Sequence, residues 1–427
     1  MITNFIAENY RSIDEEIQLS FEADTGIKDM GNSGYSIAAN SRVLNTKAFY
    51  GANSSGKSNV FKAVNRMKSM ILQSVKLNTG ERLPYDPFLL SDKPMRPTKF
   101  EMEFVDENDR FKYGFRYTSH RIENEWLIVK SPKRSVKTLF ERNLGDIRID
   151  EQNFAEGIAI QAGNIPLNDN RLLLSLAAQL GGAVSKRVIE WFMTKLNAVS
   201  GLRDRSYMRY TRETLHTNEE YRAGILSFIK SMDLGFSDVR TEQIDIDEIP
   251  LPKGIPAEVV SSLRDHPVIS ANAIHKKYNV EGQEVGYVEF DVDEKESDGT
   301  KKLFNMAGPI VDTLKKGKSL FVDELDSQLH PLLTSALVNL FNSPETNPHG
   351  SQLIFTTHDT NLLSKKLLRR DQVVFVEKDK RAQTHLTPMM SIILDNGAKP
   401  RTDSNYEKNY LEGKYGAIPY YERDFEG

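Results

Sequence analysis

Alternating hydrophobic and polar positions predict short β-strands at the start of the chain. Met1–Phe5 and Ile17–Phe21 alternate in this way, and an apolar run from Val43 to Tyr50 leads directly into a loop that begins at Gly51. After the loop, apolar residues return at the spacing of one helix face, at Val60, Phe61, Val64, Met67, Ile71 and Val75. The loop is therefore predicted to join a strand to a helix.

The pattern then turns from strands to helices. Residues 98–104 and 111–117 predict a hairpin, and residues 124–130 a further strand. Helical spacing is clearest in residues 170–196 and 218–235. The acidic, proline-bearing stretch that follows, "TEQIDIDEIPLPKGIPAE", predicts a linker.

Strands return in the last third of the chain. They are predicted near Val268 and over 285–292, followed by a helix over 300–315 and by alternating strands and helices in "KSLFVDE", "HPLLTSALVNLF", "SQLIFTTHD" and "QVVFVEKD". We therefore predict an α/β fold with two halves, 1–150 and 266–427. A mainly helical insertion, 151–265, separates these halves.

The amino-acid composition excludes several kinds of site and function. The absence of cysteine excludes disulfides and thiolate metal sites, and a net charge of −4 gives no global basic field for nucleic acid. No run of eighteen apolar residues is present, and the first twenty residues carry charges throughout. We expect a cytoplasmic protein with no membrane role.

The loop itself carries the first chemical signal, "GANSSGKS". Its glycines allow backbone N–H groups to turn inward around phosphate oxygens, Lys57 brings positive charge to the β- and γ-phosphates, and the Ser58 hydroxyl suits Mg²⁺. The strand before it and the helix after it are the context that this motif requires. The predicted nucleotide-binding residues of the loop are Gly51, Asn53, Gly56, Lys57, Ser58 and Asn59.

Two acids end a later apolar strand, "SLFVDE". Asp323 is predicted to hold the Mg²⁺ shell, and Glu324 to orient and polarise a water. Two acids at a strand end often only solvate it, but beside a phosphate loop the catalytic interpretation is favoured.

Two further stretches fit the same chemistry. "QLIFTTHD" ends the next strand, so the His358 imidazole is predicted to reach the γ-phosphate. In "EKESDGTKKLF", Ser297 and Gly299 begin a helix and form a second candidate anion site. An ordinary helix cap would give the same pattern as this second stretch.

These four stretches follow one another in the order and spacing of ATP-binding-cassette ATPases. The chain resembles the AAA-type ATP-binding proteins of the bacterial abortive-infection group, AbiLi and RloA, which are close to the overcoming-lysogenization-defect (OLD) and RecF-like ATPases. The resemblance spans both predicted halves. It is carried by "ENYRSI", "FYGANSSGKSN", "ESDGTKKLFNMAGPI", "LFVDELDSQLHPLL", "PETNPHGSQLIFTTHDTNLL", "LLRRDQVVFVEKD" and "YLEGKYGAIP".

The resemblance implies an ABC-type P-loop ATPase head and roles for individual residues. Ser297 and Gly299 match the cassette signature, although "ESDGT" departs from the usual "LSGGQ". Asp326 matches the loop between paired sites, and His358 the switch histidine. Arg11 resembles a basic residue near the nucleotide, or is an exposed arginine at a strand end. No glutamine loop is visible.

The resemblance also implies partners. In such ATPases the signature of one subunit closes over the P-loop of another, which implies a head-to-tail homodimer or higher oligomer with composite ATP sites. OLD proteins add a Toprim nuclease, and Glu377 ends a suitable strand here, but no Asp-x-Asp pair follows it. We therefore expect an ATPase that regulates a separately encoded effector, a nuclease or Toprim-like protein among the candidates, in anti-phage defence.

Two other functions stay open. A RecF-like repair ATPase would grip DNA directly, and its local support is Arg203, Arg205, Arg209 and Arg212 interleaved with Tyr207 and Tyr210, together with "KSPKRSVK". A scaffold could instead bind ATP without turnover, but Glu324 in the water-orienting position argues against it. The pairs Asp245/Asp247 and Asp291/Asp293 are predicted to solvate a linker and a turn.

Overall fold

The computed structural model describes residues 1–28, 30, 33–92, 95–199, 205–236, 238–244, 268–394, 397, 399–401 and 404–419. The contacts between residues divide the chain into two compact units. The first unit combines Met1–Ala198, Lys316–Asp326 and Leu337–Gly427, and the second combines Val199–Lys315 with Ser327–Ala336. The P-loop lies in the first unit, and the "ESDGT" stretch lies in the second.

A seven-stranded antiparallel sheet forms one layer of the first unit, in the order β10-β9-β8-β7-β6-β1-β2. Its strands are Ile2–Glu8 (β1), Ile17–Ser20 (β2), Thr98–Asp106 (β6), Asp109–Tyr117 (β7), Ile122–Lys130 (β8), Lys137–Asn143 (β9) and Asp146–Ile149 (β10). The predicted hairpin is β6–β7, which confirms that the period-2 pattern placed its strands correctly.

A six-stranded sheet forms the second layer, in the order β11-β15-β16-β5-β17-β18. Its strands are Thr46–Tyr50 (β5), Leu196–Val199 (β11), Ser319–Val322 (β15), Gln352–Thr356 (β16), Val373–Lys378 (β17) and Thr384–Pro388 (β18). The four central strands are parallel, and β5 lies between β16 and β17. Their carboxyl ends therefore meet along one edge of the sheet, where α/β folds place their ligands.

The helix α1 (Lys57–Gln73) packs against this second sheet through the predicted apolar face. Phe61 makes edge-to-face contacts with Phe49 of β5 and Phe321 of β15, at 5.5 and 5.3 Å between ring centroids. The other regular elements of the first unit are Tyr35–Ala38 (β3), Ser41–Leu44 (β4), Ala155–Ala162 (α2), Leu173–Gln179 (α3), Ala183–Thr194 (α4) and Tyr406–Leu411 (α11), with short 3₁₀ turns at Ser74–Lys76, Thr360–Leu362, Arg370–Gln372 and Met389–Ser391. Pro331–Asn342 (α10) runs from the second unit into the first.

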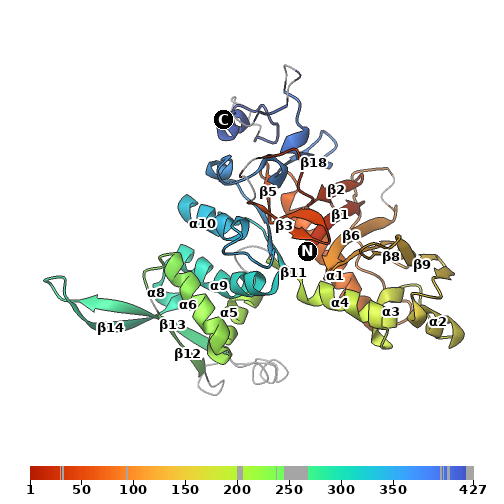
Figure 1. Ribbon diagram of the computed structural model, residues 1–427, viewed down its shortest axis with the longest axis horizontal. Helices are drawn as coiled ribbons and strands as arrows, with labels where there is room; N and C mark the ends of the chain where they lie inside the picture. The colour runs from red at the N-terminus through yellow and green to blue at the C-terminus, as the bar shows by residue number, and fades with distance from the viewer. Residues whose placement is uncertain are drawn as a thin grey trace, which may run out of the picture. The chain divides into compact units, whose positions relative to one another are not determined.

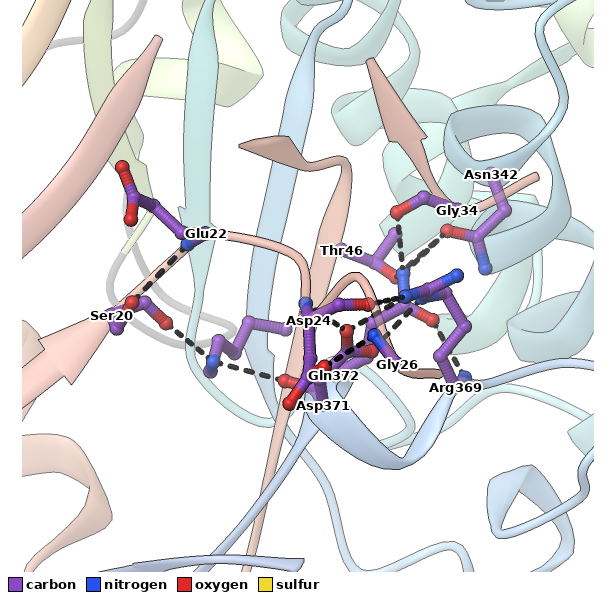
Figure 2. A network of polar contacts seen from close by, with 11 residues as sticks. Ser20, Glu22, Asp24, Gly26, Gly34, Thr46, Asn342, Arg369, Asp371 and Gln372 are labelled. Carbon is purple, nitrogen blue, oxygen red and sulfur yellow. Dashed lines mark hydrogen bonds and ion pairs between the residues drawn. The ribbon is translucent and has the colours of Figure 1, made fainter. Parts of the chain in front are cut away.

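A buried polar network ties the chain before β3 to the turn before β17 (Figure 2). The Arg369 guanidinium forms two hydrogen bonds with the Asp371 carboxylate, which also accepts from the Asp24 backbone N–H. The Lys47 ammonium donates to the carbonyl oxygens of Ser20 and Asp371, at 2.5 and 3.0 Å. Burial lowers the pKa of Lys47 to about 8, with Asp371 opposing part of the shift.

The second unit contains both helices and a sheet. Its elements are Arg205–Thr217 (α5), Glu219–Ser231 (α6), Asp238–Ile244 (β12), Val268–Tyr278 (β13), Glu284–Asp291 (β14), Val292–Lys295 (α8) and Asp298–Lys316 (α9). The strands β12, β13 and β14 pair antiparallel, and the β13–β14 hairpin extends as an arm beyond the helices of this unit (Figure 1).

These units differ from the predicted division. Residues 151–198 belong with the P-loop half, and residues 268–315 belong with the second unit. The predicted "mainly helical" character of the insertion is incomplete, because β12–β14 form its sheet. Two predicted elements are also divided in the structure. The run 43–50 forms parts of two strands, β4 and β5. The helical stretch 170–196 is interrupted between α3 and α4 by Gly181 and Gly182, because glycine favours a break in a helix.

None of the helices in the described part of the chain is both long enough and apolar enough to span a membrane.

Candidate nucleotide site

The P-loop follows β5, the strand at the centre of the parallel sheet. Two of its glycines are required by close packing. A Cβ at Gly51 would clash with the Val376 carbonyl of β17, and a Cβ at Gly56 would clash with the Thr384 hydroxyl of β18. Gly56 also has a φ of +104°, which side chains other than glycine rarely adopt. The conformation of the loop is thus constrained by close packing against β17 and β18 as well as by its own glycines.

Lys57 begins α1 and turns back over the loop. Its ammonium donates to the carbonyl oxygens of Gly51 and Ala52, at 2.7 and 3.0 Å. Burial lowers the pKa of Lys57, while the nearby carboxylates of Asp323 and Glu324 oppose that shift. The ammonium is therefore held at the place where a P-loop binds phosphate.

Thr356 links the two acids that follow β15. Its hydroxyl donates to the Asp323 carboxylate and accepts from the Glu324 backbone N–H, both at 2.7 Å. Glu324 itself has a φ of 54°, an uncommon backbone conformation that often marks functional positions. Since Thr356 is fully buried at the end of β16, it fixes the acids relative to the sheet.

His358 follows Thr356 by two residues and lies beside the same acids. Its backbone N–H donates to the Asp326 carboxylate at 3.1 Å. Burial lowers the pKa of His358, and the Lys57 ammonium lowers it further, while Asp326, Glu324 and Asp323 oppose the shift. The imidazole is thus neutral at neutral pH, able to donate or accept a hydrogen bond.

A cavity of about 250 Å³ lies at this edge of the sheet. It is lined by Asn53, Ser54, Ser55, Gly56, Lys57, Ser58, Asn59, Asp323, Glu324, Thr356, His358 and Lys378. The oxygen donors of Ser58, Asp323 and Glu324 are the kind that Mg²⁺ prefers. Ser55 Oγ is buried and has no hydrogen-bond partner among the described residues, which suits an incoming phosphate oxygen. The residues therefore fit a magnesium–nucleotide complex.

Comparison with known proteins identifies the family. Residues 48–364 match the family model described as "AAA domain, putative AbiEii toxin, Type IV TA system". The chain belongs to this AAA family. The match covers the P-loop, both acids and His358, so membership supports nucleotide binding and ATPase activity at this cavity.

Solved structures resemble this AAA protein at low sequence identity. The SMC head domain from Thermotoga maritima is 13% identical, with 91% of this chain and 98% of that chain covered and a TM-score of 0.42. An SMC head bound to the C-terminal winged-helix domain of ScpA is 15% identical, with 90% and 97% covered and a TM-score of 0.44. No curated protein matches the chain in sequence.

Two residues that brace the P-loop, Ser12 and Thr384, were not predicted. The Thr384 hydroxyl of β18 donates to Ser12 Oγ at 2.8 Å and to the Ser55 carbonyl at 3.1 Å, and Asn59 Nδ2 donates to Ser12 Oγ at 2.7 Å. Ser12, Thr384 and the loop are distant in sequence, so no local pattern could reveal them. Asn59, predicted as nucleotide-binding, thus also has a bracing contact.

The two candidate signature residues have structural roles in the second unit. Ser297 Oγ accepts from the Thr300 backbone N–H at 3.2 Å, so it caps the first turn of α9. A Cβ at Gly299 would clash with the Gln328 carbonyl, so glycine is needed for close packing there. Contact between these two residues and a nucleotide of another chain stays a prediction.

Arg11 and Glu377 have partners away from the proposed phosphates. Arg11 has a φ of 52° and pairs with Asp86 at 3.7 Å, and the cavity is lined by other residues. The Glu377 carboxylate, at the end of β17, accepts from the Ala417 backbone N–H at 3.2 Å.

The arginine-rich stretch packs partly within its own unit. Arg212 is nearly buried and pairs with Asp293 at 2.7 Å, and Arg209 pairs with Glu213 at 2.5 Å. Asp291 caps α8. Arg203, Asp245 and Asp247 lie outside the described residues.

Proposed function

We propose that the protein is a cytoplasmic Mg²⁺-dependent ATPase of an anti-phage defence system, related to the AbiLi and RloA group. It regulates a separately encoded effector according to the nucleotide that it holds. The observation that carries the ATPase part is the convergence of Lys57, Ser58, Asp323, Glu324 and His358 around one cavity. The family description, which names a toxin–antitoxin system, supports the defence setting and a second protein.

Each residue has a distinct task in this mechanism. Lys57 offsets the charge of the β- and γ-phosphates, and Glu324 accepts a proton from the attacking water as a general base. Thr356 holds the Asp323 carboxylate and the backbone N–H of Glu324, which keeps both residues at the end of the sheet. Neutral His358 can hydrogen-bond at the γ-phosphate. Ser58 and Asp323 would hold Mg²⁺, which supplies charge neutralisation to the phosphates.

The ATPase part is tested by phosphate release and nucleotide binding. The wild type is expected to hydrolyse ATP, and Lys57→Ala is expected to lose ATP binding, because only backbone dipoles would then meet the phosphate charge. Lys62→Ala, an exposed lysine of the same helix, is the control. Undiminished ATP affinity in Lys57→Ala would show that the loop is not the site.

The defence part is tested in cells. The gene and its neighbouring open reading frame, expressed together, should reduce phage plating, and Glu324→Gln or loss of the neighbour should abolish that protection. Equal plating with and without both genes would contradict the defence proposal and leave the ATPase proposal intact.

Direct DNA binding is the second candidate, since Lys133 and Arg134 are exposed at the turn between β8 and β9. Such binding should weaken steeply with salt and fall further in a Lys133→Glu, Arg134→Glu double variant. Salt-independent or absent binding would remove this candidate.

A further inference from the structure

A second cation, Lys378, reaches the nucleotide cavity from the strand on the far side of β5. The strand β17 runs parallel to β5, with Val373, Val374 and Phe375 paired to Ala48, Phe49 and Tyr50. Its carboxyl end therefore lies against the start of the P-loop. The tight fit between Gly51 and the Val376 carbonyl confirms this closeness.

The last two residues of β17 have different surroundings. Glu377 is engaged by the C-terminal segment, where its carboxylate accepts from the Ala417 N–H and packs against Gly416. Successive side chains of a strand point to opposite faces. Lys378 accordingly lies on the other face and lines the cavity together with Lys57. The adjacent acid, Asp379, pairs with Arg381 at 3.4 Å and with His385 at 3.3 Å within the described part of the chain.

The strand order indicates which phosphate group of a nucleotide Lys378 would contact. Asp323 and Glu324 follow β15, and His358 follows β16, all on one side of β5, whereas β17 lies on the other side. The acids act where the γ-phosphate is cleaved. A cation on the opposite side of the loop is therefore placed nearer the phosphates that remain on ADP.

We propose that Lys378 binds the α-phosphate of the nucleotide and sets the affinity for ATP and ADP alike. This inference rests on the proposed ATPase function of the cavity. A contact that is equally strong before and during hydrolysis contributes uniform binding, so it changes KM and the dissociation constants but not kcat. Removing one charge-assisted hydrogen bond of this kind is expected to weaken both nucleotides about tenfold.

The experiment compares Lys378→Gln, Lys378→Arg and Lys380→Gln with the wild type. Lys380 is an exposed lysine two residues further along the same turn and outside the cavity lining, so it is the matched control. Dissociation constants for ATP and ADP are measured by titration calorimetry, and kcat and KM by phosphate release. Lys378→Gln should weaken both nucleotides by a similar factor with kcat unchanged, and Lys378→Arg should restore most of the affinity.

Three results would overturn the assignment. Unchanged affinity for both nucleotides would make Lys378 a surface lysine. Weaker binding of ATP alone, or a fall in kcat at constant affinity, would place its contact at the γ-phosphate. If the wild type binds nucleotides without hydrolysing ATP, the proposed function fails, yet the affinities for ATP and ADP still decide the role of Lys378.

Discussion

Lys57, Glu324 and His358 show how charges are balanced in the cavity. Lys57 is desolvated, which lowers its pKa, but three carboxylates around it favour the charged form. The same ammonium helps to keep the His358 imidazole neutral. Around the γ-phosphate the site thus combines the Lys57 ammonium, the Glu324 carboxylate and the neutral His358 imidazole.

Glu324→Gln tests the assignment of the base. The amide keeps the shape of the side chain and loses the carboxylate, so ATP should stay bound while kcat falls about a hundredfold or more. Single-turnover phosphate release and ATP binding measure the two effects separately. A variant that hydrolyses ATP at the parental rate would assign the base elsewhere, with His358 the next candidate.

Lys47 supplies a prediction for stability, because burial lowers its pKa from 10.5 to about 8. Between these values the unfolded chain keeps the proton that the folded protein has released, so the unfolded state binds more protons and stability rises with pH. Relative to Lys47→Met, the free energy of unfolding of the wild type should increase from pH 8 to 10.5, by at most about 3 kcal/mol. Denaturant unfolding at several pH values measures this difference.

The comparison has a clear contrary result. Parallel pH curves for the wild type and Lys47→Met would show that the lysine titrates normally in the folded protein. The exposed Lys62→Met is the control for loss of a lysine without burial.

The sequence predicted that residues of separate motifs would lie at one edge of the sheet, and their roles in binding and catalysis stay predictions. Lys57, Ser58, Asp323, Glu324 and His358 all line one cavity, because each follows a strand of the same parallel sheet. Thr356 and Thr384 could not be foreseen, since a threonine in a strand is ordinary until pairing places it against an acid or a loop.

At the scale of elements, the β17–β18 hairpin and the turn after β1 hold the P-loop in shape. Thr384 of β18 and Ser12 of that turn are hydrogen-bonded to each other and to the loop. The loop therefore depends on segments 47 and 329 residues away along the chain, as well as on its own glycines.

Thr384→Val tests this brace. The methyl group preserves the size of the side chain but removes the donor to Ser12 and to the Ser55 carbonyl, which costs about 1–2 kcal/mol of unfolding free energy. Nucleotide affinity should fall as well, because the loop loses one of its supports. Thr387→Val, in the same strand, is the control, and equal stability and affinity in both variants would show that the brace is dispensable.

The elements also show which patterns misled the prediction. The helical periodicity of 170–235 was correct for α3, α4 and α6, but proximity along the chain assigned all of it to one insertion. In the structure α3 and α4 belong to the unit of the P-loop, because Trp191 of α4 stacks on Phe104 of β6 at 4.0 Å between ring centroids. Such long-range packing leaves no period in the sequence.

At the scale of the whole molecule, the proposed catalytic groups and the candidate signature lie in different units. Lys57 and Glu324 belong to the first unit, whereas Ser297 and Gly299 belong to the second. The chain passes from one unit to the other directly after Asp326. Gln328, two residues later, packs against Gly299, and Lys302 donates to the Ser327 carbonyl at 2.8 Å. The acids are therefore joined by only a few residues to the segment that supports the candidate signature.

This connection gives a prediction for assembly. If Ser297 and Gly299 of one chain contact the γ-phosphate held by Lys57 of another, ATP stabilises the closed dimer and ADP releases it, since only a ligand with different affinities for two states can shift them. Light scattering of Glu324→Gln with ATP, with ADP and without nucleotide should show a dimer with ATP alone. Adding Ser297→Arg should obstruct the part of the composite site that Ser297 and Gly299 contribute, and so prevent that dimer. Glu294→Arg, at an exposed position of the same unit, is the control for adding an arginine elsewhere on this surface. Thermal unfolding checks that loss of the Ser297 cap leaves the fold intact. Assembly that is indifferent both to nucleotide and to the arginine at position 297 would refute the composite site, and the P-loop would then serve a monomer or an assembly held by other surfaces.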